Sequence, residues 1–153
     1  IYIPALDECV FAAKGQGAWH RVGSQPLTRA SVSSRERLED GLFVTSQIDL
    51  FDARGVFTVF QELQRRAYIT RTWGDSYGYL LVATGRAELM VDPEMKIWDA
   101  GAIQPILEEA GGTFTDWNGT PTIHNGEGIG SNGHVLSEVL ALTRPFSQPA
   151  EDR

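Results

Sequence analysis

The segment IWDAGAIQPILEEAGGTF, residues 97–114, places an aspartate beside a tryptophan at the start of an apolar-periodic stretch and ends on two glycines. Asp99 stands where a helix would begin, and aspartate is a favoured N-cap because its carboxylate accepts hydrogen bonds from the free N–H groups of the first turn. The positive end of the helix dipole also keeps such a carboxylate ionised. Capping explains Asp99 without any function, but a carboxylate has enough lone pairs to bind a cation at the same time.

Other patterns that could do chemistry carry less weight. The three histidines, His20, His124 and His134, are isolated and lack the HxxxH spacing of a helical metal site. GEGIGSNG, residues 126–133, is rich in glycine like a phosphate-binding loop, but it lacks the GK[ST] ending. We therefore expect a plain loop there, before the last helix.

Helices and strands that would position Asp99 can be read from the apolar periodicity. Short strands joined by glycine turns are expected at the start as a meander, and strands and helices alternate afterwards, which favours a layered α/β sandwich with a mixed sheet. The expected strands are 1–4, 9–13, 18–22, 42–46, 68–71, 87–91 and 113–117, and the expected helices are 53–67, 76–84, 99–110 and 134–143.

Details of the Asp99 helix can also be predicted. Pro105 removes a backbone donor, so a kink or a tight first turn is expected, and Gly111 should end the helix in a left-handed cap. Trp98 is expected to pack beneath the site. Residues 144–153 contain two prolines and little to bury, and we expect a frayed tail.

Composition limits the class of protein. With 153 residues and 42% hydrophobic content the chain suits one domain with a real core. The net charge of -7 argues against binding nucleic acid or an anionic membrane. No apolar run approaches the about 18 residues of a membrane span. Cys9 is the only cysteine and the N-terminus shows no export signal, so a cytoplasmic location is expected.

Several separated segments resemble the inositol monophosphatase family. WDAGAIQPILEEAGG (98–112) resembles its C-terminal signature, in which a Trp-Asp pair opens a helix that closes on Glu-Ala-Gly-Gly. LLVATGRAELMVDP (80–93) resembles the preceding helix and strand, and residues 1–19 resemble the stretch that continues the sheet after the metal-binding half. RTWGDSYGY (71–79) is most similar to the branch that hydrolyses histidinol phosphate. The resemblance covers residues 1–143 and implies the C-terminal half of an αβαβα fold, with residues 144–153 as a tail.

The resemblance implies roles for particular residues. Asp99 corresponds to an aspartate that helps to hold Mg²⁺, a hard cation that prefers carboxylate, phosphate and water oxygens. Asp75 and Asp92 match positions that touch the substrate, and an acidic pair suits the amine and imidazole of histidinol phosphate. The alternatives without function are that Asp75 caps a helix and that Asp92 is a turn residue. Thr45 and Ser46 end a strand near the expected pocket and could bind substrate hydroxyls, or be ordinary strand-end hydroxyls.

The chain also departs from the family. In the family, the remaining metal ligands come from N-terminal Glu-Glu and Asp-Pro-Ile-Asp-Gly-Thr motifs, and neither motif occurs here. Asp92-Pro93 is followed by Glu94-Met95, which breaks the second motif. One carboxylate does not make a two-metal site, so this chain alone is expected to be inactive.

Two functions follow from this comparison. The first is the C-terminal part of a Mg²⁺-dependent phosphomonoesterase that acts on a small phosphorylated metabolite, histidinol phosphate or inositol 1-phosphate, as a homodimer. The alternative is a non-catalytic binding or dimerisation module that kept the fold.

Overall fold

The computed structural model describes residues 1–147, and a small antiparallel sheet opens the chain. Its four strands lie in chain order, as the predicted meander requires, and Gly15 and Gly17 adopt left-handed φ angles of 75° and 73° in the turn between the second and third strands. A 3-10 helix, η1 (Pro4–Leu6), stands at the first corner. The strands are β1 (Tyr2–Ile3), β2 (Glu8–Ala12), β3 (Ala18–Val22) and β4 (Thr28–Arg29).

A second sheet of five strands, in the order β6-β5-β7-β9-β8, forms the centre of the molecule. β5 is parallel to both of its neighbours, whereas β9 runs antiparallel to β7 and β8, so the sheet is mixed as expected. The strands are β5 (Leu42–Thr45), β6 (Ile69–Thr72), β7 (Leu89–Asp92), β8 (Thr113–Thr115) and β9 (Gly128–Ser131).

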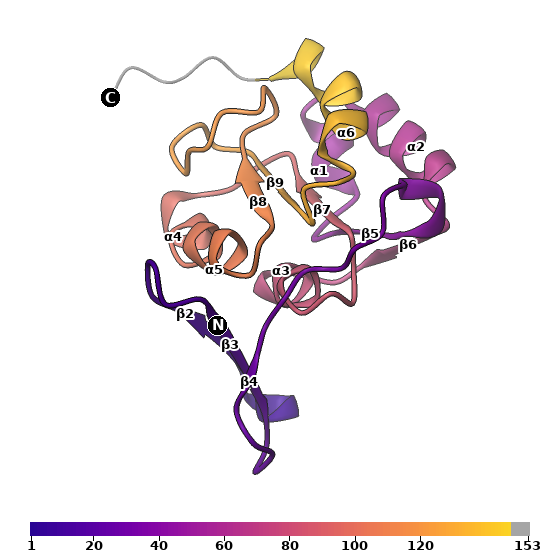
Figure 1. Ribbon diagram of the computed structural model, residues 1–153. Helices are drawn as coiled ribbons and strands as arrows, with labels where there is room; N and C mark the ends of the chain where they lie inside the picture. The colour runs from indigo at the N-terminus through magenta and orange to yellow at the C-terminus, as the bar shows by residue number, and fades with distance from the viewer. Residues whose placement is uncertain (148–153) are drawn as a thin grey trace.

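Helices cover both faces of this second sheet (Figure 1). Alternate residues of its strands enter two separate cores, because successive side chains of a strand point to opposite faces. Val44 and Met90 pack with α3, α5 and the first sheet, whereas Phe43 and Leu89 pack with α1, α2 and α6. The helices are α1 (Asp49–Ala53), α2 (Phe57–Arg66), α3 (Ser76–Ala83), α4 (Ile97–Ala100), α5 (Ile103–Glu109) and α6 (Leu136–Thr143), with 3-10 helices η2 (Leu38–Asp40) and η3 (Arg144–Phe146).

The layers therefore run from the first sheet through α3 and α5 to the second sheet and then to α1, α2 and α6. This arrangement confirms the predicted α/β sandwich. The predicted helix 53–67 is divided into α1 and α2 at Gly55, whose φ of 76° is left-handed. The predicted helix 99–110 is likewise two helices, α4 and α5, and Pro105 lies in the first turn of α5, where its missing N–H is not needed. Gly111 has the predicted left-handed φ, at 86°.

The glycine-rich segment 126–133 is not a plain loop, and that prediction is wrong. Its residues 128–131 form β9, which is buried and pairs with β7 and β8 on either side. A Cβ on Gly130 would lie 2.7 Å from the Tyr79 ring and 2.8 Å from Leu107, so α3 and α5 pack closely against this strand only because it lacks a side chain there. The glycines serve packing, which a composition-based assignment does not detect.

The segment after α6 also differs from the prediction. Residues 144–146 form η3, whose Phe146 carbonyl accepts a hydrogen bond from Arg54 at 2.6 Å. A frayed tail is therefore wrong for residues 144–147. Residues 148–153 lie outside the described part of the chain, and the domain division at residue 143 stays a prediction.

Candidate functional site

A cavity of about 290 Å³ lies at the carboxyl ends of β5 and β7. Ser46 follows β5 and Asp92 ends β7, and because these strands are parallel their ends meet at one edge of the sheet, where open α/β sheets bind ligands. The starts of α3 and α4 close the sides. The lining residues are Ser46, Gln47, Leu50, Asp75, Ser76, Tyr79, Asp92, Glu94, Met95, Lys96, Asp99 and Ile103.

Asp92 is the most constrained acid in this cavity. The residue is 3% exposed, and its carboxylate accepts hydrogen bonds from both the N–H of Ser46, at 2.9 Å to Oδ1, and the hydroxyl of Tyr79, at 2.9 Å to Oδ2. The Ser46 and Thr45 hydroxyls donate at 3.2 and 3.3 Å. Four donors on one buried carboxylate hold it in a single orientation.

Burial raises the pKa of Asp92, and the hydrogen bonds from Ser46, Tyr79 and Thr45 oppose that rise without cancelling it. Burial also raises the pKa of Tyr79 well above its usual value, and the charges of Asp92 and Asp99 add to the effect. Tyr79 therefore remains a neutral hydrogen-bond donor over the whole physiological pH range.

Asp99 lies on the same cavity but does not cap its helix in the predicted way. α4 begins at Ile97 with Lys96 as the N-cap residue, so Asp99 occupies the third helical position and accepts the N–H of Lys96 at 2.9 Å on Oδ2. This is the reverse bond of a capping box. It orients the carboxylate while Oδ1 carries no hydrogen bond within the described chain, so that oxygen can bind a cation. Trp98 is 77% exposed, so the prediction that it packs beneath the site is wrong.

The other predicted residues have different positions. Asp75 is exposed, lines the cavity and occupies the N-cap position of α3 without a capping bond from its side chain, so its carboxylate can point toward a ligand. Ser46 lines the cavity, whereas Thr45 is fully buried behind it and reaches Asp92 only. The structure thus brings together Asp75, Asp92, Asp99 and Ser46, and places Thr45 as a support for Asp92.

Sequence reasoning did not assign Tyr79, Glu94 or Lys96 to the site. Glu94 and Lys96 pair at 3.3 Å, and Lys96 is the only cationic side chain among the lining residues. Both lie within seven residues of the Trp-Asp pair, and this closeness in sequence could have indicated that they belong to the same site. Tyr79 gave a weaker signal: it ends the segment 71–79 that resembles the histidinol-phosphatase branch, but a tyrosine in an apolar helix is usually a core residue.

Asp99 fits one ligand position of a Mg²⁺ site, since it offers a hard carboxylate oxygen beside a cavity. Asp92 is already engaged by its four donors. Within residues 1–147, no three His, Cys, Asp or Glu side chains lie close enough to hold a metal ion. A complete magnesium site would need oxygen ligands in addition to those that the described residues bring together.

Known proteins resemble this chain in sequence and in fold. Residues 1–148 match the model of the inositol monophosphatase family. The chain is 35% identical over 137 residues to the histidinol-phosphatase of Streptomyces coelicolor, and this match covers 90% of this chain and 52% of that relative. It is 37% identical over 140 residues to the histidinol-phosphatase of Chlorobaculum parvum, and this match covers 92% of this chain and 52% of that relative. The solved structure of an inositol monophosphatase from Anabaena superposes with a TM-score of 0.80 at 27% identity, covering 99% of this chain and 61% of that one.

These relatives confirm the resemblance on which the expected site residues were based, including its likeness to the histidinol-phosphatase branch. The chain spans about half the length of the curated relatives that it matches. No helix among residues 1–147 is long and apolar enough to cross a membrane.

Proposed function

Because this chain belongs to the inositol monophosphatase family, we propose that it contributes one wall of the active site of a magnesium-dependent phosphomonoesterase. The observation that carries the proposal is the cavity itself, in which Asp99 and Asp92 are both oriented by hydrogen bonds at the carboxyl edge of the central sheet. Orientation before binding is what a catalytic site requires, since it removes the need to reorganise the groups during reaction.

Each residue then has a distinct task. Asp99 would be one ligand of Mg²⁺, since only one of its carboxylate oxygens accepts a hydrogen bond from Lys96. When bound with the ligands that complete its site, the metal would lower the pKa of a water molecule and screen the phosphate charge. Asp92 places a fixed negative charge beside the substrate, and Ser46 and Tyr79 keep its carboxylate in place. Lys96 supplies a positive charge at the cavity wall that suits a phosphate.

Histidinol phosphate is the substrate that this cavity supports best. Four carboxylates line it, those of Asp75, Asp92, Glu94 and Asp99, against one ammonium group. A bound Mg²⁺ would neutralise part of that charge. The remaining acids would still favour an organic cation, and histidinol carries an amine and an imidazole. Inositol is neutral and gains nothing from a negative wall. Inositol 1-phosphate is the second candidate, which the similarity to the Anabaena inositol monophosphatase supports.

The alternative function is a binding or dimerisation module without catalysis. The observation that favours it is that no complete set of metal ligands occurs within residues 1–147. Homodimerisation and a cytoplasmic location are part of the first proposal, and light scattering of the purified protein tests the oligomeric state.

A phosphate-release assay distinguishes the two functions. The polypeptide in which residues 1–153 naturally occur is incubated with Mg²⁺ and either histidinol phosphate or inositol 1-phosphate, after its intact mass has been compared with the 16.9 kDa of this chain. We expect hydrolysis with a higher kcat/KM for histidinol phosphate. Asp99→Asn should lower activity by about 100-fold or more, since a metal ion contributes several kcal/mol to the transition state.

The matched control is Asp40→Asn, an exposed aspartate in η2 that does not line the cavity. It should leave kcat/KM unchanged. An Asp99→Asn protein with wild-type activity, or a natural polypeptide that binds neither Mg²⁺ nor substrate, would contradict the catalytic proposal.

Substrate preference has its own test. Asp75→Asn and Asp92→Asn should raise KM for histidinol phosphate more than for inositol 1-phosphate. Only histidinol phosphate carries a cationic group that would lose its attraction to these carboxylates. Equal effects on both substrates would argue that the two acids do not recognise a cation.

A further inference from the structure

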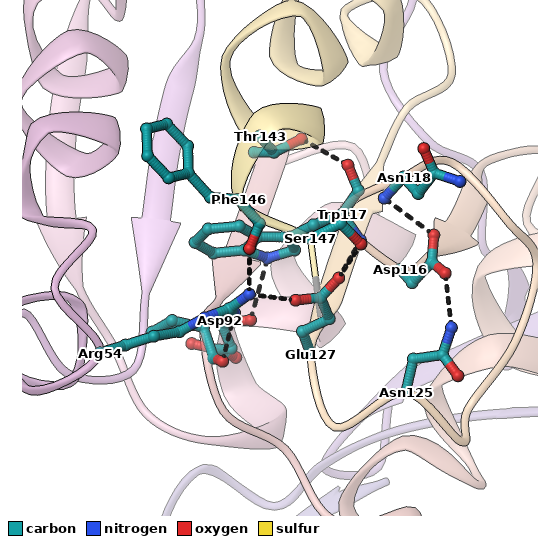
Figure 2. A network of polar contacts seen from close by, with 11 residues as sticks. Arg54, Asp92, Asp116, Trp117, Asn118, Asn125, Glu127, Thr143, Phe146 and Ser147 are labelled. Carbon is teal, nitrogen blue, oxygen red and sulfur yellow. Dashed lines mark hydrogen bonds and ion pairs between the residues drawn. The ribbon is translucent and has the colours of Figure 1, made fainter. Parts of the chain in front are cut away.

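The main chain at Asp92 and Pro93 is held by two side chains that are not among the described residues lining the cavity. Arg54, at the end of α1, donates from Nη1 to the Pro93 carbonyl at 2.7 Å, and the indole N–H of Trp117 donates to the Asp92 carbonyl at 3.2 Å. Figure 2 shows Asp92, Trp117, Arg54 and Glu127 within one network of polar contacts. The two carbonyls that follow the cavity carboxylate are therefore fixed from elements distant in the sequence.

Arg54 is itself held in one position. Its side chain is 12% exposed and pairs at 2.5 Å with Glu127, whose side chain is fully buried. The guanidinium lies 4.2 Å from the centre of the Trp117 ring, a cation–π contact, and Nη2 also donates to the Phe146 carbonyl at 2.6 Å. A planar guanidinium with several fixed donors suits this task, whereas a lysine could satisfy only part of it.

Glu127 connects the remaining parts of the network. Its Oε1 accepts the N–H of Trp117 at 2.9 Å and the hydroxyl of Ser147 at 2.6 Å, while Oε2 takes Arg54. A buried ion pair contributes little net stability compared with apolar residues of the same size, because both charges lose their water. The network around Arg54 and Glu127 is thus better explained by the geometry that it imposes than by stability alone.

We propose that Arg54 is a positioning residue for Asp92, acting through the Pro93 carbonyl and supported by Glu127 and Trp117. The four donors to the Asp92 carboxylate come from Thr45 at the end of β5, from Ser46 directly after it and from Tyr79 of α3, at 2.9–3.3 Å. Hydrogen bonds weaken steeply when such distances grow, so a shift of the main chain at residues 92–93 would release the carboxylate from its donors. The role of Asp92 toward a substrate rests on the proposed function, but its positioning by Arg54 does not.

Nuclear magnetic resonance of the 153-residue chain tests this proposal. The amide proton of Ser46 donates to Asp92, so its resonance reports the ionisation of that carboxylate as pH is varied. Asp75, Glu94, Lys96 and Asp99 share the cavity and stay unchanged in every variant. Arg54→Gln removes the charge that holds Pro93, and we expect the pKa of Asp92 to rise above that of the wild type, because the bonds that favour its ionised form are weakened.

Two further variants make the result decisive. Arg65→Gln removes an exposed arginine of α2 that pairs with Glu62 at 2.7 Å, and it should leave the Ser46 resonance and its titration as in the wild type. Arg54→Lys keeps a charge beside Glu127 with fewer fixed donors, and the pKa of Asp92 should rise by an intermediate amount. If Arg54→Gln does not fold, Arg54→Lys alone decides.

A purely structural role predicts a different outcome. Arg54 variants that lower the free energy of unfolding but titrate at Ser46 like the wild type would overturn the proposal. The measurement needs neither substrate nor activity. A natural polypeptide without phosphatase activity would therefore refute the proposed function and leave the positioning result standing.

Discussion

Replacement of Gly130 by alanine tests the close packing of α3 and α5 against β9. A Cβ at this position of β9 would lie 2.7 and 2.8 Å from two ring carbons of Tyr79 and 2.8 Å from Cδ1 of Leu107. Non-bonded carbons rest at about 3.5–4.0 Å, so these side chains would have to move by about 1 Å. Both are buried, at 1% and 0% exposure, and a close-packed interior leaves little room for such movement.

The expected loss of stability follows from two opposing effects. Overpacking of a close-packed core destabilises by about 1–3 kcal/mol. Replacing a glycine also restricts the unfolded chain, which stabilises by about 0.4–1 kcal/mol where the backbone conformation is compatible. Packing prevails for Gly130→Ala, and a net loss of about 1–2 kcal/mol in the free energy of unfolding is expected.

Urea denaturation with Gly74→Ala as the control measures this loss. A Cβ on Gly74 would meet its nearest atom, Cβ of Ser46, at 3.7 Å, which is an ordinary contact, so stability should change by less than about 0.5 kcal/mol. The same displacement of the Tyr79 ring should loosen the 2.9 Å bond from its hydroxyl to Asp92. A Gly130→Ala chain as stable as the Gly74→Ala control would refute the packing argument for β9.

Three further predictions concern the polar groups. Tyr79→Phe removes a donor that opposes the effect of burial on Asp92, so the pKa of Asp92 should rise further, as read from the Ser46 amide resonance. Burial alone would raise the pKa of Glu8, but hydrogen bonds from His20 and Arg86 lower it, and the net effect is a lowered pKa. Ionised Glu8 therefore stabilises the folded chain above the ordinary carboxyl pKa, and this stabilisation is lost as pH falls. Glu8→Gln should therefore flatten the acid limb of the stability curve, measured by thermal unfolding at several pH values. Glu127→Gln leaves Arg54 without its buried counter-charge and should destabilise by about 3–5 kcal/mol in urea.

Much of the fold could be predicted from periodicity. The alternation of strands and helices, the opening meander and the mixed central sheet follow from apolar patterns that local sequence carries. β5 and α6 lie within one or two residues of their predicted bounds at most ends, because their buried faces are continuous. The boundary between α1 and α2 was missed, since Gly55 interrupts a helical pattern that continues on either side.

β9 shows what periodicity cannot supply. Gly-Ile-Gly-Ser has little strand propensity, yet it pairs on both edges because β7 and β8 flank it and two helices pack against the side that lacks side chains. Tertiary packing decides the structure there. The direction of Trp98 was missed for a related reason, because the start of α4 at Ile97 rather than Asp99 rotates the tryptophan into solvent.

The candidate site divides in the same way. Asp99 could be singled out because residues 98–112 resemble the signature of the family, and even its orienting bond comes from Lys96, three residues away. The geometry of Asp92 depends instead on Ser46, on Trp117 and on Arg54 through Pro93, which are separated in sequence by 46, 25 and 39 residues from the groups that they contact. No local pattern encodes such contacts. The sequence and its family resemblance therefore point to Asp99 more readily than to the residues that hold Asp92 in place. Variants of Arg54 test whether those distant residues matter to the site or only to the fold.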